Sequence, residues 1–88
     1  MRYNADVDAQ QVAETVREGN PDALEVKVLA DGSVAMLADL MFTRAIHLGC
    51  TTWGWSRRFC FEDRVRAQQE FDALAGEDDE PTGCVARR

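Results

Sequence analysis

The sequence predicts one α+β domain, in which an antiparallel sheet of about four strands forms a meander packed by an N-terminal and a C-terminal helix. Apolar residues recur at helical spacing near both ends of residues 1–76, and alternating segments flank an Asp-Gly pair between them. With 88 residues, 45% of them hydrophobic, the chain has material for one core and too little for a second domain. We therefore expect a single compact domain over residues 1–76.

The first helix is expected over residues 8–18. Asp6 or Asp8 is suited to accept hydrogen bonds from the free N–H groups of a first turn, and Gln11 stands where a capping box has its partner. Gly19 suits the left-handed conformation that closes a helix. The residues at helical spacing that would face the core are Val12, Ala13 and Val16.

A β-hairpin is the next expected element. Leu24, Val26 and Val28 alternate with polar residues, which is the period of a half-buried strand. Asp31-Gly32 is a pair suited to the positive backbone angles of a two-residue hairpin turn. The alternation resumes after this turn at Val34, Met36 and Ala38.

Residues 40–48 fit two structures. Their apolar residues match one face of a helix ending at Gly49, whereas Phe42, Thr43 and Ile46 suit a pleated strand. A strand is favoured, because the turn-like segment after it leads into another strand-like segment.

The fourth strand is expected over residues 55–61. Successive residues of a strand point to opposite faces. One face then holds Trp55, Arg57, Phe59 and Phe61, and the other holds Ser56, Arg58 and Cys60. We therefore expect Trp55 to be a core residue beside the two phenylalanines.

A second helix is expected to follow, with Glu62 and Asp63 placing negative charge at its first turn, where the helix dipole favours it. Its apolar stripe, Ala67, Phe71, Leu74 and Ala75, ends at Gly76. We expect this helix to cover one sheet face together with the first helix. Residues 77–88 are expected to form an acidic, flexible C-terminal tail.

The formal net charge of −6 is distributed unevenly. Residues 1–40 hold eight acidic and three basic side chains, whereas residues 41–66 hold five arginines and two acidic side chains. A negative chain lacks the basic surface that general binding to nucleic acid or to an anionic membrane requires. We therefore expect no direct nucleic-acid contact and no membrane binding.

The composition also predicts a cytoplasmic protein. The longest apolar segment is far shorter than the roughly 20 residues of a membrane helix, and the N-terminus lacks the apolar block of a secretion signal. The three cysteines are odd in number and widely spaced, which is typical of free thiols and not of a disulfide framework.

Four side chains, His47, Cys50, Cys60 and Cys84, are of types that zinc accepts, but structural zinc sites bring ligands in close pairs and only His47 and Cys50 are close here. We predict no metal, no cofactor and no catalytic residue. A small thiol-dependent enzyme or regulator that uses Cys50 or Cys60 with His47 is the alternative to a binding function.

The most distinctive local feature is Trp53-Gly54-Trp55 followed by Arg57-Arg58, since tryptophan and arginine are enriched at the energetic centres of protein interfaces. Trp53 lies in the expected turn, where no core role accounts for it. Trp53, Arg57 and Arg58 are therefore candidate protein-binding residues.

A second candidate set is Asp78, Asp79 and Glu80, which would engage a basic surface of a partner by imitating the charges of a phosphate backbone. An antiparallel sheet with an unpaired edge would also support a homodimer.

Residues 55–61 (WSRRFCF), the helix after them and residues 75–83 (AGEDDEPTG) resemble the ending of small phage and prophage accessory proteins. In these proteins an R-[FWY]-[CS]-[FY] strand enters a helix and a short G-x-x-x-E-P-x-G segment. The resemblance covers the last third of the chain and implies a mobile-element context, in which small acidic domains such as anti-CRISPR proteins inhibit host defence.

The expected function is thus a non-enzymatic protein-binding inhibitor or accessory protein, of anti-CRISPR type, acting in the host cytoplasm. It would bind a host protein or ribonucleoprotein complex that handles nucleic acid and block it by steric or electrostatic occlusion. A subunit of a phage structural or replication assembly is a further alternative.

Overall fold

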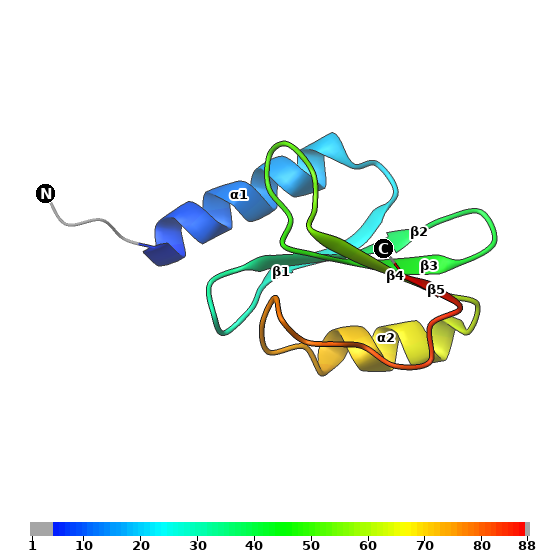
Figure 1. Cartoon of the computed structure of the whole chain (residues 1–88). Helices are drawn as coiled ribbons and strands as arrows, with labels where there is room; N and C mark the ends of the chain where they lie inside the picture. The colour runs from blue at the N-terminus through cyan, green and yellow to red at the C-terminus, as the bar shows by residue number, and fades with distance from the viewer. Residues whose placement is uncertain (1–4, 88) are drawn as a thin grey trace, which may run out of the picture.

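Residues 5–87 are described in the computed structural model, and within them two helices lie on opposite faces of one antiparallel sheet (Figure 1). The elements are α1 (Ala5–Gly19), β1 (Ala23–Val28), β2 (Val34–Asp39), β3 (Arg44–Leu48), β4 (Arg57–Phe61), α2 (Arg64–Asp72) and β5 (Ala86–Arg87). In this part of the chain each strand pairs with the next, in the order β1-β2-β3-β4-β5. The predicted meander with a helix at each end is confirmed, and a two-residue fifth strand extends it.

The helices do not share a sheet face, which corrects the expectation from the sequence. Val34 and Met36 of β2 pack on the α1 side, whereas Ala35 and Leu37 pack on the α2 side. Five of the six β2 residues are buried, because both sets of alternating positions are apolar. A strand of this kind needs cover on both faces, and one helix supplies it on each side.

The two layers of the core differ in the size of their side chains. The largest fully buried side chains of the described residues all lie on the α2 side: Phe59, Phe61, Phe71, Leu37, Ile46 and Leu48. The α1 side holds smaller residues, such as Ala13, Val16 and Ala38, and among the described strands α1 contacts only β1 and β2. The half of this face over β3 and β4 is not covered by α1.

A polar residue caps the start of α2, whereas the start of α1 differs from the expectation. The carboxylate of Asp63 accepts hydrogen bonds from the backbone N–H groups of Val65 (2.9 Å) and Arg66 (3.1 Å), so Asp63 is the N-cap of α2. Helix α1 begins at Ala5, so Asp8 lies inside it and is not its cap. Side chains of residues 5–7 lie outside the description, and with them the candidate cap Asp6.

The helix ends also differ from the expectation. Gly19 is not among the described glycines with positive φ, and α1 closes instead with the Asn20 amide donating to the Val16 carbonyl at 2.7 Å. Helix α2 ends at Asp72, before Ala75. A side-chain cap has thus replaced the expected left-handed glycine of α1.

The β1–β2 hairpin forms at the predicted place with a longer turn. Leu29 N–H donates to the Ser33 carbonyl at 2.8 Å, and Gly32 N–H donates to the Leu29 carbonyl at 2.9 Å. Gly32 has a φ of 86°, whereas no non-glycine residue in the described chain has a positive φ. The predicted two-residue turn is therefore wrong, and the three-residue turn with a left-handed glycine at its end takes its place.

The strand interpretation of residues 40–48 is confirmed for its second half. Strand β3 starts at Arg44, and a hydrogen bond of 2.9 Å from Leu40 N–H to the Thr43 carbonyl closes the β2–β3 turn. Met41 and Phe42 form the tip of this turn and are 85% and 86% exposed. Phe42 is therefore not part of the strand.

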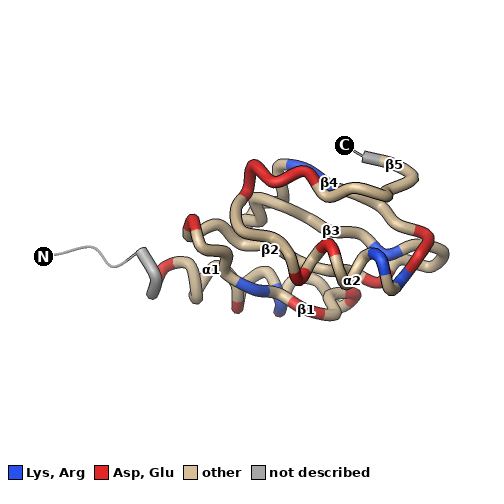
Figure 2. The backbone as a smooth tube through the Cα atoms, turned by 90° about the horizontal axis from the view of Figure 1, so that it is seen from below, with Lys and Arg blue, Asp and Glu red and all other residues tan. Residues whose placement is uncertain are grey.

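Residues 77–87, expected as a tail, lie against the domain. The Arg57 guanidinium donates to the backbone carbonyls of Glu77 and Asp79, and Figure 2 shows the acidic run beside the arginines of β4. Cys84 packs against the α2-side core, and Ala86 pairs with Cys60 in the sheet. The folded unit thus extends beyond residue 76.

No helix in residues 5–87 is long and apolar enough to cross a lipid bilayer.

Candidate functional site

The β3–β4 turn exposes the Trp53 side chain to solvent. Thr51 N–H donates to the Gly54 carbonyl at 2.7 Å, and Trp53 N–H donates to the Thr51 hydroxyl at 3.1 Å. These bonds fix the backbone on both sides of an indole that is 94% exposed. The turn therefore presents a large apolar side chain to the surroundings.

Trp55 is not a core residue beside Phe59 and Phe61, which corrects the expectation from strand periodicity. Strand β4 begins only at Arg57, so the alternation does not reach back to Trp55. The indole lies on the α1 side of the sheet, with its centroid 5.1 Å from the His47 ring, and remains 39% exposed. Trp55 thus covers part of the sheet face that α1 leaves free.

Arg57 and Arg58 are separated because consecutive strand residues point to opposite faces. The Arg58 guanidinium lies 5.2 Å from the centre of the Trp55 ring. Arg57 instead binds the carbonyls of residues 77 and 79, and its Nη1 lies 3.8 Å from a carboxylate oxygen of Glu80. Arg58 belongs to the tryptophan side of the domain, whereas Arg57 fastens the C-terminal segment.

The acidic candidates have different surroundings. Asp79 accepts hydrogen bonds from the backbone N–H groups of Ala75 (2.6 Å) and Gly76 (3.3 Å), which occupies one of its carboxylate oxygens. Glu80 is exposed and close to Arg57, and Asp78 is exposed. Asp78 and Glu80 remain accessible to a partner, while Asp79 holds the chain's own backbone.

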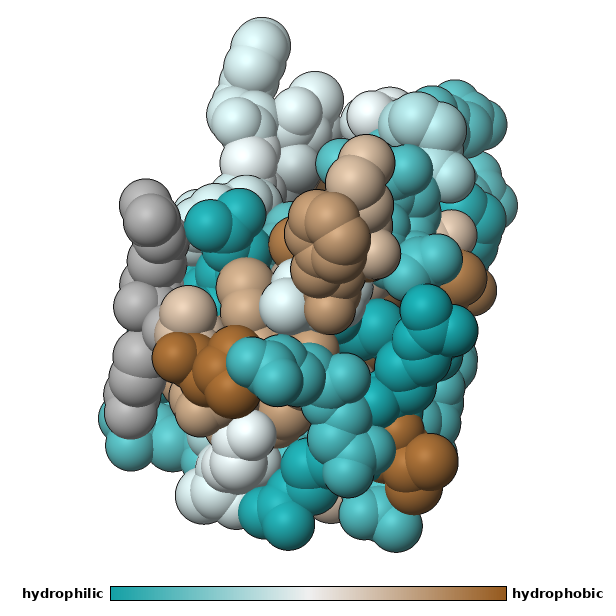
Figure 3. Space-filling model, turned by 90° about the vertical axis from the view of Figure 1, so that its right-hand side faces the viewer, coloured by the Kyte–Doolittle hydropathy of each residue, from teal (hydrophilic) through white to brown (hydrophobic). Residues whose placement is uncertain are grey.

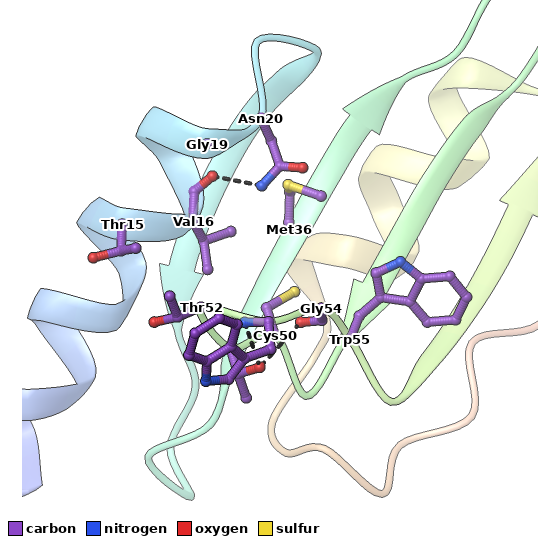
Figure 4. A pocket seen from close by; sticks show the side chains of 11 residues that line it. Thr15, Val16, Gly19, Asn20, Met36, Cys50, Thr52, Gly54 and Trp55 are labelled. Atoms are coloured by element: carbon purple, nitrogen blue, oxygen red, sulfur yellow. Dashed lines mark hydrogen bonds between the residues drawn. The ribbon is translucent and has the colours of Figure 1, made fainter.

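A groove runs between α1 and the β3–β4 turn. Its first hollow, of about 260 Å³, has an apolar floor and is walled by the tryptophan turn; the floor and walls include Val16, Met36, Cys50, Trp53 and Trp55. Figure 4 shows Val16 of α1 and Cys50 pointing into this hollow, with Trp55 directed away from the helix. The sequence indicated the tryptophans but gave no signal for the groove, since its walls come from distant segments.

A second hollow, of about 210 Å³, continues the groove toward the start of α1 and shares Cys50 and Thr51 with the first. Glu77 lines it together with Gly49, and the Glu77 N–H donates to the Asp31 carboxylate at 2.8 Å. Gly49 has a φ of 64°, and a β-carbon there would collide with the side chains of Ser56 and Glu77. We call the two hollows together the α1 groove.

His47 lies beneath Trp55 and is 8% exposed, and neither ring nitrogen has a hydrogen-bond partner among the described residues. Burial, with a smaller contribution from the nearby Arg58 charge, lowers the pKa of His47 to about 4. The imidazole is therefore neutral at pH 7.

Cys50 does not have the environment of a nucleophile. Its Sγ donates to the backbone carbonyl of His47 at 3.5 Å, not to the ring, and burial raises the pKa of this thiol to about 11. A reactive cysteine needs the opposite shift. Within residues 5–87, no group of three or more His, Cys, Asp or Glu side chains is placed to hold a metal ion.

A second exposed apolar site, at the opposite end of the sheet, was missed by sequence reasoning. Met41 and Phe42 project from the β2–β3 turn, and Figure 3, which faces this end, shows apolar patches separated by polar residues. The adjoining hollow is lined by Asp22, Asp39, Leu40, Met41 and Arg64, three of which are charged. This end lacks the apolar groove that adjoins Trp53.

Comparisons of the chain with protein-family models, with curated proteins and with solved structures give no match.

Proposed function

We propose that this chain is a protein-binding domain whose binding surface is centred on Trp53 and the α1 groove. The observation that carries the proposal is the 94% exposure of an indole on a turn fixed by its own hydrogen bonds. Because the backbone of the turn is already fixed, binding has to order only the two side-chain torsions of Trp53, and the indole buries a large apolar area. Tryptophan dominates many interface energies for this reason.

The surroundings of Trp53 extend this surface. Trp55 is partly exposed beside it, and Arg58 is stacked on Trp55 and thereby held in place at the edge. The first hollow, with its apolar floor, adjoins the indole on the α1 side. A large anchor residue next to a hollow is the arrangement that a protein partner would fill with a complementary side chain.

The test is affinity capture of partners with the wild type, Trp53→Ala and Phe42→Ala. Phe42 is the matched control, because it is 86% exposed on a turn at the other end of the sheet. We expect Trp53→Ala to weaken the wild-type complex by about 30-fold or more, as for an interface hot spot, and Phe42→Ala to leave it unchanged. Equal retention by wild type and Trp53→Ala would overturn the proposal.

The more specific function, occlusion of a host complex that handles nucleic acid, rests on the acidic character of the chain. Several basic side chains of the described residues are engaged internally: Arg17 with the Val26 carbonyl, Lys27 with the Phe71 carbonyl, and Arg57 with residues 77–80. Asp78 and Glu80 are exposed and supply charge to the surface. Asp78→Lys with Glu80→Lys should weaken binding to such a complex and reduce its salt dependence.

A further inference from the structure

The α1 groove has the dimensions of a site for side chains. Its two hollows measure about 260 Å³ and about 210 Å³. They are contiguous through Cys50 and Thr51 and lie along one helix. This shape fits two neighbouring side chains of an extended peptide.

The two hollows differ in chemistry. The first has the floor of Val16, Met36 and Cys50, each no more than 5% exposed, beside the Trp53 indole. The second is lined by the Glu77 carboxylate, and Asp31 contacts the backbone of the same residue. Glu77 is the only charged residue among the described residues that line the second hollow, which also has apolar walls, Ala9, Val12 and Val34. An apolar side chain suits the floor of the first hollow, and a lysine or arginine suits the second, because its stem is apolar and its charge can reach Glu77.

The charges around the groove favour a basic occupant. No lysine or arginine stands among the described residues that line either hollow. Arg17, which projects from α1, donates to the Val26 carbonyl of β1. The net charge of −6 would attract a basic segment from a distance.

We propose that the α1 groove binds an extended segment of a partner protein that carries an apolar side chain next to a lysine or arginine. The apolar side chain packs on Met36 against Trp53, and the cationic side chain meets Glu77. This inference rests on the proposed protein-binding function and names the chemistry of the partner segment.

The test is a selection from a random peptide library on the full chain, with counter-selection on the Trp53→Ala variant. We expect enrichment of peptides with an apolar residue within about two positions of an arginine or lysine. Enrichment without a basic residue, or no enrichment over the counter-selection, would overturn the inference.

A selected peptide is then compared with its citrulline or acetyl-lysine form, which keeps the shape and removes the charge. We expect a loss of at least tenfold in affinity, and the same loss for the unmodified peptide with Glu77→Gln. Asp78→Asn is the matched control, because Asp78 is the next residue, is exposed and does not line the groove. Equal effects of the two substitutions would show that the peptide responds only to general charge.

The two proposals fail differently. If Trp53→Ala abolishes capture of the protein partner while Glu77→Gln and the basic peptide leave capture unchanged, the protein-binding function stands and the groove inference is wrong. If Trp53→Ala has no effect on capture, the proposed binding surface around Trp53 is wrong, and the groove inference fails with it.

Discussion

The α2 face and the α1 face of the sheet are packed differently. The α2 face is filled by large residues such as Phe61 and Phe71, which are fully buried. The α1 face is covered by a helix over β1 and β2 and by the exposed tryptophan turn beyond them. Stability is therefore concentrated on one side of this small domain, which leaves the other side free to carry exposed apolar groups.

The largest effect should come from the α2 face. Phe71→Ala removes a fully buried ring from the contact between α2 and the sheet, so the free energy of unfolding should fall by about 3–5 kcal/mol. Urea denaturation measures it, with Phe71→Leu as a milder change should the alanine variant not fold. A loss below about 1 kcal/mol would contradict the conclusion that stability is concentrated on the α2 face.

The pKa of His47 reports how well Trp55 shields the α1 face of the sheet from water. Its folded pKa of about 4 lies below the ordinary value of 6.5, so the unfolded chain binds the proton first. Stability should therefore fall as the pH drops from about 6.5 to about 4, by up to about 3 kcal/mol.

The control for this pH dependence is His47→Leu, which should lose that component while the carboxylate contributions at lower pH remain. An NMR titration of the His47 ring should give a midpoint near 4. A midpoint near 6.5 would mean that Trp55 does not shield the ring.

Arg57 and Arg58 are consecutive residues whose side chains lie on opposite faces of the sheet. Arg57→Ala removes the guanidinium that binds the carbonyls of Glu77 and Asp79, so stability should fall by about 1–2 kcal/mol. Amide hydrogen exchange should accelerate across residues 77–85. Arg58→Ala is the matched control, and similar acceleration in both variants would contradict the separation.

Trp53 should have the smallest effect on stability. Because its side chain is 94% exposed, Trp53→Ala should change the free energy of unfolding by no more than about 0.5 kcal/mol. A larger destabilisation would show that the indole packs on the domain and is not held ready for a partner.

The sequence predicted the elements well because local patterns determine them. The Asp31-Gly32 pair located the hairpin, and Asp63 located the start of α2. The position of the helices on opposite faces was also readable, since Ala35 and Leu37 make the second strand apolar on both sides. The error was to follow only one set of alternating positions.

The site was less accessible to sequence reasoning, because it depends on contacts between distant residues. Alternation along β4 shows that Arg57 and Arg58 must diverge, but it does not show that Arg57 meets residues 77–80 some 20 positions later. The groove likewise requires α1 and the β3–β4 turn to be placed side by side. The exposure of Trp53 was predicted from the sequence because exposure on a turn is a local property.

Gly49 limits how the β3–β4 turn can be varied. Its φ of 64° disfavours any other residue, and a side chain there would strike Ser56 and Glu77. Gly54, with a φ of 154° at the other end of the turn, is constrained by its backbone alone. A library that varies this turn to change what the domain binds should therefore randomise Thr52 and Trp53 at its tip. It should keep both glycines, because their backbone conformations hold the two sides of the turn in place.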